Sequence, residues 1–118
     1  MIKKTKIKAR VLKNLSQQIK GFMFCFKQKE CLMFNLKNLK NKCIHMWFVF
    51  FPLYAIWLDE KKKVIQINYC KPFELKLWCC EKARWLIEIP EKIFISNKYN
   101  KKIKINSLVE VINDTFKN

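Results

Sequence analysis

The sequence predicts an α+β fold. We expect a single compact domain, mainly antiparallel β-sheet or a partly open barrel, with one or two short helices. Three observations lead to this prediction. The 118 residues are 51% hydrophobic and 14% aromatic, enough to form one packed core. Residues 43–58 are almost all apolar, and a charged turn follows them. No internal repeat or linker divides the chain, so one domain is expected over residues 1–118.

The first third of the chain predicts a strand, a helix and a second strand. Residues Ile2 to Ala9 alternate with lysines, which is typical of an amphipathic strand. Apolar residues then recur at helical spacing, and Ser16 can cap a short helix near 16–23 that ends near Gly21. The segments that follow predict a loop or hairpin, a short apolar strand and a polar turn, at 24–30, 31–36 and 37–42.

The apolar run at 43–58 predicts two buried strands separated by Pro52. Aromatic and β-branched residues favour strand over helix, and Pro52 interrupts regular pairing. Both faces of the first segment are mostly apolar, so we expect a strand buried on both sides over 43–51. The uninterrupted apolar stretch is also much shorter than the roughly 20 residues of a membrane-spanning helix. No membrane span is therefore expected.

A charged turn predicts a hairpin after this run. Asp59 to Lys63 forms the solvated turn, and residues 64–69 then alternate between apolar and polar. This pattern predicts a hairpin between 53–58 and 64–69, with a wetter face on the second strand.

The last third predicts further strands and one short terminal element. Residues 73–77 alternate as a strand would, and 83–89 predict another strand that Pro90 stops, with Glu88 on its solvated face. Isoleucine-rich segments flank an Asn/Lys turn at 97–102, and 108–112 fit either a helix or a strand. Because the chain has one glycine, we expect asparagines to take left-handed turn positions, namely Asn97, Asn100 and Asn106.

Composition limits the classes of function. The single glycine excludes glycine-rich phosphate-binding loops. The net charge of +16 indicates a polyanionic partner, yet the basic residues are lysines except for Arg10 and Arg84. We therefore expect nucleic-acid binding to be weak, nonspecific and salt-dependent. No apolar segment follows the first lysines as in a signal peptide, so a cytoplasmic location is expected.

The six cysteines do not predict a metal site. None form a C-x-x-C pair, which is the usual spacing for zinc. Cys43 and His45 share a face of the expected strand, but no second pair completes four ligands by spacing. We expect no metal and no cofactor. In a cytoplasmic protein the thiols are expected to be reduced, and a disulfide is left open for a hyperthermophilic source.

Several blocks of sequence, in order, resemble the DUF192 family, also called UPF0127. The resemblance covers about residues 5–105, leaves 106–118 as a C-terminal extension, and is greatest to the archaeal, cytoplasmic kind. It implies a compact α+β domain dominated by antiparallel strands, and it implies no activity. The blocks are Gly21-Phe22-Met23-Phe24, residues 31–36, Ile44-His45-Met46-Trp47 continuing to Leu53, residues 56–59, Val64-Ile65-Gln66-Ile67, Lys71-Pro72-Phe73 and residues 83–90.

The chain departs from the family pattern at three places. Tyr54 stands where the family usually has an aspartate, and Lys92 stands where it usually has a glycine. The late Gly-Asp pair of the family is absent from 100–103. If these positions form a pocket in the family, this chain has lost part of it; if they are turn devices, the fold compensates.

Three functional hypotheses follow. The first is a non-catalytic binding or accessory domain that takes an unknown protein or small ligand on a surface formed by His45, Trp47, Tyr54 and Trp57, unless all four belong to the core. The second is an RNA-binding accessory protein with a lysine-rich face and exposed aromatics. The third is a hydrolase-like enzyme that uses His45, the only histidine, as its base. No spacing nominates a nucleophile, so we assign no catalytic residue.

Overall fold

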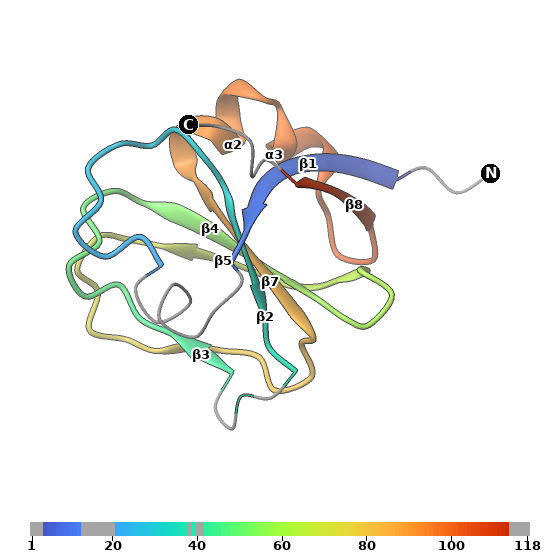
Figure 1. Ribbon diagram of the computed structural model, residues 1–118, viewed down its shortest axis with the longest axis horizontal. Helices are drawn as coiled ribbons and strands as arrows, with labels where there is room; N and C mark the ends of the chain where they lie inside the picture. The colour runs from blue at the N-terminus through green and yellow to red at the C-terminus, as the bar shows by residue number, and fades with distance from the viewer. Residues whose placement is uncertain (1–3, 13–20, 38, 40–41, 114–118) are drawn as a thin grey trace.

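The computed structural model describes residues 4–12, 21–37, 39 and 42–113. Its strands and helices confirm the predicted α+β class (Figure 1). In chain order they are β1 (Lys4–Val11), β2 (Leu32–Asn35), β3 (Cys43–Ile44), β4 (Leu53–Leu58), β5 (Val64–Cys70), β6 (Trp78–Cys79), β7 (Trp85–Pro90), α2 (Glu91–Ser96), α3 (Tyr99–Lys102) and β8 (Leu108–Asn113).

Six strands form one curled sheet in the order β5-β4-β7-β2-β1-β8, and β3 pairs with β6 in a separate two-stranded ladder. The sheet curls until its two edges meet at one end, where the backbone N–H of Val64 donates to the carbonyl of Ser107 at 2.8 Å. The result is a half-barrel, which confirms the expected partly open barrel. β1 pairs in parallel with both β2 and β8, and the other pairings are antiparallel.

The hairpin predicted between 53–58 and 64–69 is confirmed. β4 and β5 pair antiparallel from Leu53↔Cys70 to Leu58↔Val64, and the side chain of Asp59 accepts hydrogen bonds from turn backbone N–H groups. β4 lies between β5 and β7 in the sheet, and its two faces belong to the two core clusters on either side of the sheet. The strands expected near the N-terminus and at 31–36 are also present, as β1 and β2.

The core lies on both faces of the sheet. On one face, Trp57 and Ala55 of β4 pack with Phe22, Met46 and Phe51 from the loops that cover the sheet. On the other face, residues of β1, β4 and β7 pack under α2 and α3, which supply Phe94 and Tyr99 (Figure 1). Within the described residues, no helix is long and apolar enough to cross a membrane.

The expected strand over 43–51 is wrong beyond its first two residues. Only Cys43 and Ile44 pair as β3, and a loop follows to Pro52. Within it the backbone N–H of Val49 bonds to the carbonyl of Met46, and Phe48 has a left-handed φ of 59°. A left-handed residue reverses the chain, so side chains that a strand would bury are exposed instead.

Three further expectations near the C-terminus are corrected. Residues 73–77 form a loop, because Phe73 also takes a left-handed φ, of 59°. The Asn/Lys segment expected as a turn at 97–102 contains the helix α3, and the isoleucine-rich segment before it belongs to the helix α2. Residues 108–113 form the strand β8, which pairs with β1. Asn106 has the expected left-handed φ of 76°, but the left-handed residue of the 97–102 segment is Lys98, not Asn97 or Asn100.

The expected helix near 16–23 lies largely outside the described residues. Of that segment the structure describes residues 21–23, which form a turn. Gly21 has a left-handed φ of 50°, consistent with a chain reversal at this point.

Glu88 is buried, which overturns its expected solvated position. β7 is a central strand between β4 and β2, and its two faces contribute to the two core clusters, so Glu88, which lies opposite Ala55 and Leu32, has no solvated face. Its side chain is 6% exposed. Burial raises the pKa of the Glu88 carboxyl to about 8, because the low-polarity interior disfavours the charged form.

The expectation of reduced thiols is wrong for one pair of cysteines. Cys43 of β3 and Cys79 of β6 lie opposite each other in the small ladder, with Cα atoms 4.0 Å apart, and form a disulfide. Sequence spacing could not indicate this pair because the two cysteines are 36 residues apart. Only the pairing of β3 with β6 brings them together.

Candidate functional site

His45 and Trp47 lie together in the loop that follows β3. The backbone N–H of Trp47 donates to Nδ1 of His45 at 3.1 Å, and the two ring centroids are 5.0 Å apart. His45 is half-buried, and Trp47 is 49% exposed. The turn that begins at Met46 holds both residues at the surface.

Tyr54 and Trp57 point to opposite faces of β4, because side chains alternate along a strand. Tyr54 stacks on Phe94 of α2, with ring centroids 3.9 Å apart. Trp57 is fully buried, and its Nε1–H donates to Oδ1 of Asn68 at 2.9 Å. The structure therefore brings His45 and Trp47 together, but it does not gather all four predicted site residues on one surface.

A larger aromatic surface lies beside Trp47. We call it the aromatic end; it consists of Phe24, Phe26, Phe48, Phe50 and Phe73. Phe24 stacks on Phe48 with centroids 4.8 Å apart, and Phe26 stacks on Phe50 at 4.6 Å. Phe50 also meets the edge of Phe73 at 5.1 Å. Three loops that are distant in the sequence thus form one continuous surface.

The three loops present their phenylalanines in the same way. In each, the fourth residue of a turn donates its backbone N–H to the carbonyl of the first, and the third residue is a phenylalanine with φ near 60°. This backbone conformation usually calls for glycine and costs another residue roughly 1–2 kcal/mol. The turns are Phe22–Cys25, Met46–Val49 and Lys71–Glu74, with Phe24, Phe48 and Phe73 in third position.

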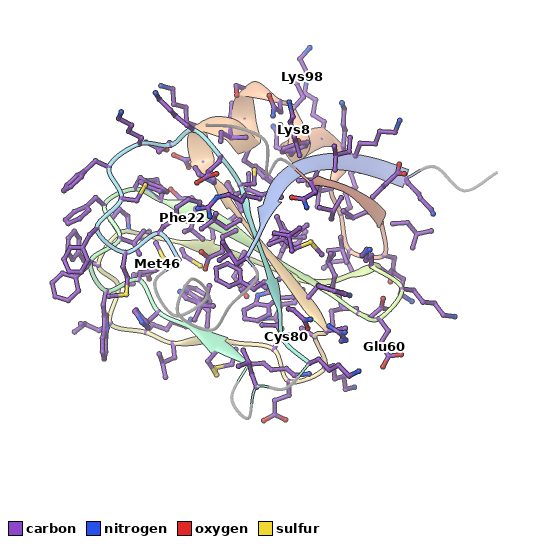
Figure 2. The ribbon with its side chains drawn as sticks, viewed as in Figure 1. Lys8, Phe22, Met46, Glu60, Cys80 and Lys98 are labelled. Atoms are coloured by element: carbon purple, nitrogen blue, oxygen red, sulfur yellow. A yellow bond between two sulfur atoms is a disulfide. The ribbon has the colours of Figure 1, made fainter. Side chains whose placement is uncertain are left out.

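Buried side chains and backbone hydrogen bonds hold the three loops together. The backbone N–H of Phe24 donates to the carbonyl of Phe48 at 2.8 Å, and that of Phe73 donates to the carbonyl of Met46 at 3.1 Å. Beneath them Met46 is fully buried, and Phe22 meets Phe51 edge-on. In Figure 2 aromatic rings project outward from the side of the ribbon on which Met46 is labelled. The exposed rings therefore rest on an anchored base.

The aromatic end is large for the surface of a monomer. Its five rings and Trp47 are between 37% and 75% exposed. With about 200 Å² for a complete aromatic side chain, this corresponds to roughly 600 Å² of exposed aromatic surface. Patches of this size commonly mark binding surfaces.

Lysines accompany these rings along the same loops. Lys27 follows Phe26, and Lys71 precedes Phe73, and the side chains of Lys29 and Lys76 are exposed as well. Glu74 is the one carboxylate in the 71–77 loop, and its Oε1 accepts the backbone N–H of Lys71 at 2.7 Å. The loops therefore carry an excess of positive charge.

Sequence reasoning missed the aromatic end, although a signal was present. Phe24 and Phe26 are two residues apart, and Phe48 and Phe50 repeat that spacing. In a strand, the second pair would lie on one buried face. The charged residues beside Phe26 and Phe73 favour exposure of these two rings.

The cysteines at positions 43, 70 and 80 are poorly suited to nucleophilic catalysis. Burial raises the pKa of the Cys70 thiol to about 12 and raises that of Cys80, so both are poor nucleophiles at neutral pH. Cys43 is held in the disulfide. Among the described residues, no three His, Cys, Asp or Glu side chains are grouped as a metal would require.

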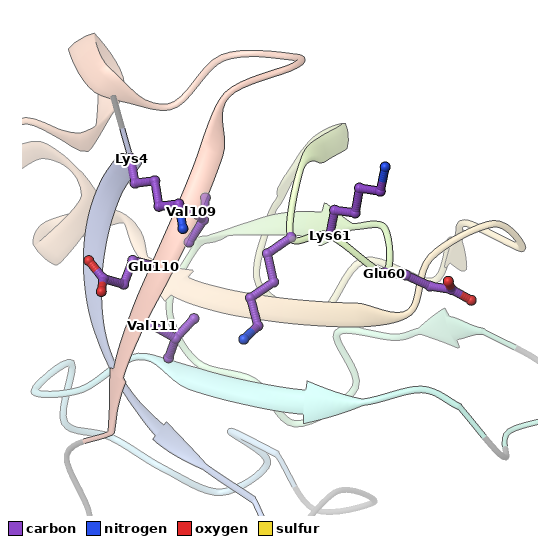
Figure 3. Close-up of a pocket in the computed structure, with 7 residues that line it drawn as sticks. Lys4, Glu60, Lys61, Val109, Glu110 and Val111 are labelled. Carbon is purple, nitrogen blue, oxygen red and sulfur yellow. The ribbon is translucent and has the colours of Figure 1, made fainter. Parts of the chain in front are cut away.

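A shallow pocket of about 250 Å³ lies elsewhere, where β8 approaches the β4–β5 turn (Figure 3). Three lysines and two glutamates line it, and it contains none of the predicted site residues. Its lining consists of Lys4, Glu60, Lys61, Lys62, Val109, Glu110 and Val111.

Two solved structures share the fold. One is a protein of unknown function from Novosphingobium aromaticivorans DSM 12444, with a TM-score of 0.60 and 19% identity over 77% of this chain and 66% of that chain, slightly under two thirds of its length. The other is a putative transcription regulator from Sinorhizobium meliloti 1021, with a TM-score of 0.63 and 12% identity over 86% of this chain and 76% of that chain. At these identities the likeness concerns the fold alone.

No curated protein matches this chain significantly. The family model of DUF192, described as an uncharacterized ACR, matches residues 1–106. That match includes every block of sequence that carries the resemblance. The protein belongs to the DUF192 family.

Proposed function

We propose that this protein is a non-catalytic binding domain whose binding surface is the aromatic end together with Trp47 and His45. The observation that carries the proposal is that three phenylalanines of this surface occupy left-handed turn positions. Glycine or asparagine would occupy these positions at a lower energetic cost. Backbone strain of this kind is maintained by the surrounding structure and is concentrated at functional sites.

The four residues predicted from the sequence have different parts in this proposal. Trp47 and His45 border the aromatic end and contact the bound partner. Tyr54 and Trp57 have a structural role on opposite faces of β4. Tyr54 stacks on Phe94, and Trp57 donates a hydrogen bond to Asn68. The partner predicted from the sequence is an unknown protein or small ligand, and the proposed binding requires no metal or cofactor.

Capture of a partner from the native cell tests the proposal. The immobilised wild-type protein is compared with Phe26→Ser and Trp47→Ser, and with Ile95→Ser as a matched control on α2 that is 56% exposed. We expect both aromatic variants to lose capture about tenfold, as at a binding hot spot, with melting temperatures little changed. His45→Ala should likewise impair capture more than stability. Equal capture by Phe26→Ser, Trp47→Ser and Ile95→Ser would refute the proposed surface.

RNA binding is a second candidate function. The net charge of +16 and the lysines next to the exposed rings favour it, because single-stranded nucleic acid binds to basic surfaces that carry aromatic side chains.

Two measurements separate this candidate from the first. Capture that disappears after nuclease treatment would identify nucleic acid as the partner. Titration of single-stranded RNA should show weak binding that falls by orders of magnitude between roughly 50 and 200 mM salt, because lysines act as point charges. Sequence-selective binding that survives about 200 mM salt would contradict this expectation of nonspecific contacts.

A further inference from the structure

We infer that the aromatic end docks on the surface of an anionic lipid bilayer. This inference rests on the proposed binding function and names the partner class of the same surface. The supporting observations are the exposed aliphatic side chains in the loop that carries Phe73, the way the rings are already stacked, and the charge of the loops.

Two exposed leucines follow Phe73 along the loop that carries it. Leu75 follows Phe73 by two residues in the same loop and is 85% exposed, and Leu77 is 56% exposed. An aliphatic side chain gives a nucleobase nothing on which to stack, whereas it transfers favourably into the acyl region of a bilayer. The combination of leucine with phenylalanine therefore favours lipid over RNA.

The rings are arranged for insertion rather than for base stacking. Phe24 and Phe48 cover one face of each other, as do Phe26 and Phe50. A base-stacking platform needs free ring faces, and stacking within each pair already covers one face of each ring. Phenylalanine also lacks a polar atom that could read a base edge. Trp47, whose ring is amphipathic, is suited to the level of the lipid headgroups.

The charge of the loops fits anionic headgroups. Lys27, Lys29, Lys71 and Lys76 are exposed in the two loops that carry Phe26 and Phe73, and the Glu74 carboxylate is engaged by a backbone N–H. Lysines next to inserted apolar side chains add electrostatic attraction to phosphatidylserine-type surfaces. A protein partner would not require both this excess of charge and the exposed leucines.

Vesicle binding tests the inference. Co-sedimentation of the wild-type protein is measured with vesicles of phosphatidylcholine alone and of phosphatidylcholine mixed with phosphatidylserine. We expect binding to the mixed vesicles, weaker binding to phosphatidylcholine alone, and a loss of about tenfold or more in the double variant Phe26→Ser/Leu75→Ser. The double variant Lys27→Glu/Lys71→Glu should lose the preference for phosphatidylserine. The control Ile95→Ser should bind as the wild type does.

Fluorescence provides a second readout that does not depend on sedimentation. Trp47 is expected to enter the bilayer interface, so vesicles with brominated acyl chains should quench its fluorescence. The contribution of Trp47 to the emission is identified as the part that is lost in Trp47→Phe. Absence of binding to the mixed vesicles, or binding that Phe26→Ser/Leu75→Ser leaves unchanged, would overturn the inference. If vesicles do not bind but capture of a protein or RNA still depends on Phe26, the lipid assignment fails and the binding function stands. If neither vesicle binding nor partner capture depends on Phe26, the lipid inference and the proposed binding function both fail.

Discussion

The buried carboxyl of Glu88 makes the stability of the protein depend on pH, and Glu88→Gln should remove that dependence. The side chain is 6% exposed, between two neighbouring strands of the sheet. Its pKa is about 8, against an ordinary value of 4.5, because burial disfavours the carboxylate. Glutamine has nearly the same shape and carries no charge at any pH.

The direction of the effect follows from the raised pKa. The folded protein holds the Glu88 proton more tightly than the unfolded chain does, so this contribution to stability is complete below about pH 4.5 and is lost as the pH rises to about 8. Each tenfold difference in proton affinity corresponds to about 1.4 kcal/mol. Across the whole window the wild-type protein should therefore lose up to about 5 kcal/mol, and Glu88→Gln should lose none of it.

Urea unfolding from about pH 5 to about pH 8 measures this difference. The two proteins should have similar stability at the acidic end, and the variant should exceed the wild type by several kcal/mol at the basic end. Other titrating groups are common to both proteins, so they cancel in the comparison. Glu60→Gln, in the exposed β4–β5 turn, is the matched control and should follow the wild type. Parallel pH profiles for the wild type and Glu88→Gln would refute the reasoning.

Three further predictions concern stability. Cys43→Ser opens a disulfide that spans 36 residues, so the free energy of unfolding should fall by about 3–4 kcal/mol in denaturant titration; an unchanged midpoint would show that the bond is absent in solution. Asn68→Ala leaves the buried Nε1–H of Trp57 without its acceptor and should cost about 1–3 kcal/mol in the same titration; an unchanged midpoint would show that this hydrogen bond does not stabilise the fold. Phe48→Gly should change the free energy of unfolding by no more than about 1 kcal/mol in thermal unfolding, because the relief of backbone strain offsets the lost ring stacking. Phe22→Ala, at a buried position, should cost about 3–5 kcal/mol. Similar losses in the two variants would show that Phe48 is a core residue.

Local sequence patterns were sufficient for the elements whose residues decide their own conformation. The hairpin of β4 and β5 follows from an apolar run, a charged turn and an alternating return, all contiguous in the chain. The same holds for β1 and β2. The family resemblance also came from contiguous blocks of residues, and the match over residues 1–106 confirms it.

Sequence patterns led to wrong predictions where apolar residues alternate regularly but the backbone does not stay extended. The segment after β3 alternates apolar residues as a strand would, and no glycine or asparagine marks the reversal at Phe48. Hydrogen bonds from Phe24 and Phe73 to that loop hold the turns, and these partners are distant in sequence. The aromatic end could be predicted only as a set of nearby phenylalanines, not as one surface.

The environment of each residue depends on the elements that pack around it in the folded protein. Glu88 follows a strand-like alternation that suggests a wet face, yet β2 and β4 flank its strand and loops cover it. Cys43 and Cys79 bond because β3 and β6 pair, and Tyr54 and Trp57 separate because β4 has two buried faces. The sequence by itself determined the strands β1, β2, β4, β5 and β7, since their residues favour extended backbone locally. Tertiary structure alone decided which residues meet, because burial and bonding depend on neighbours that lie far apart along the chain.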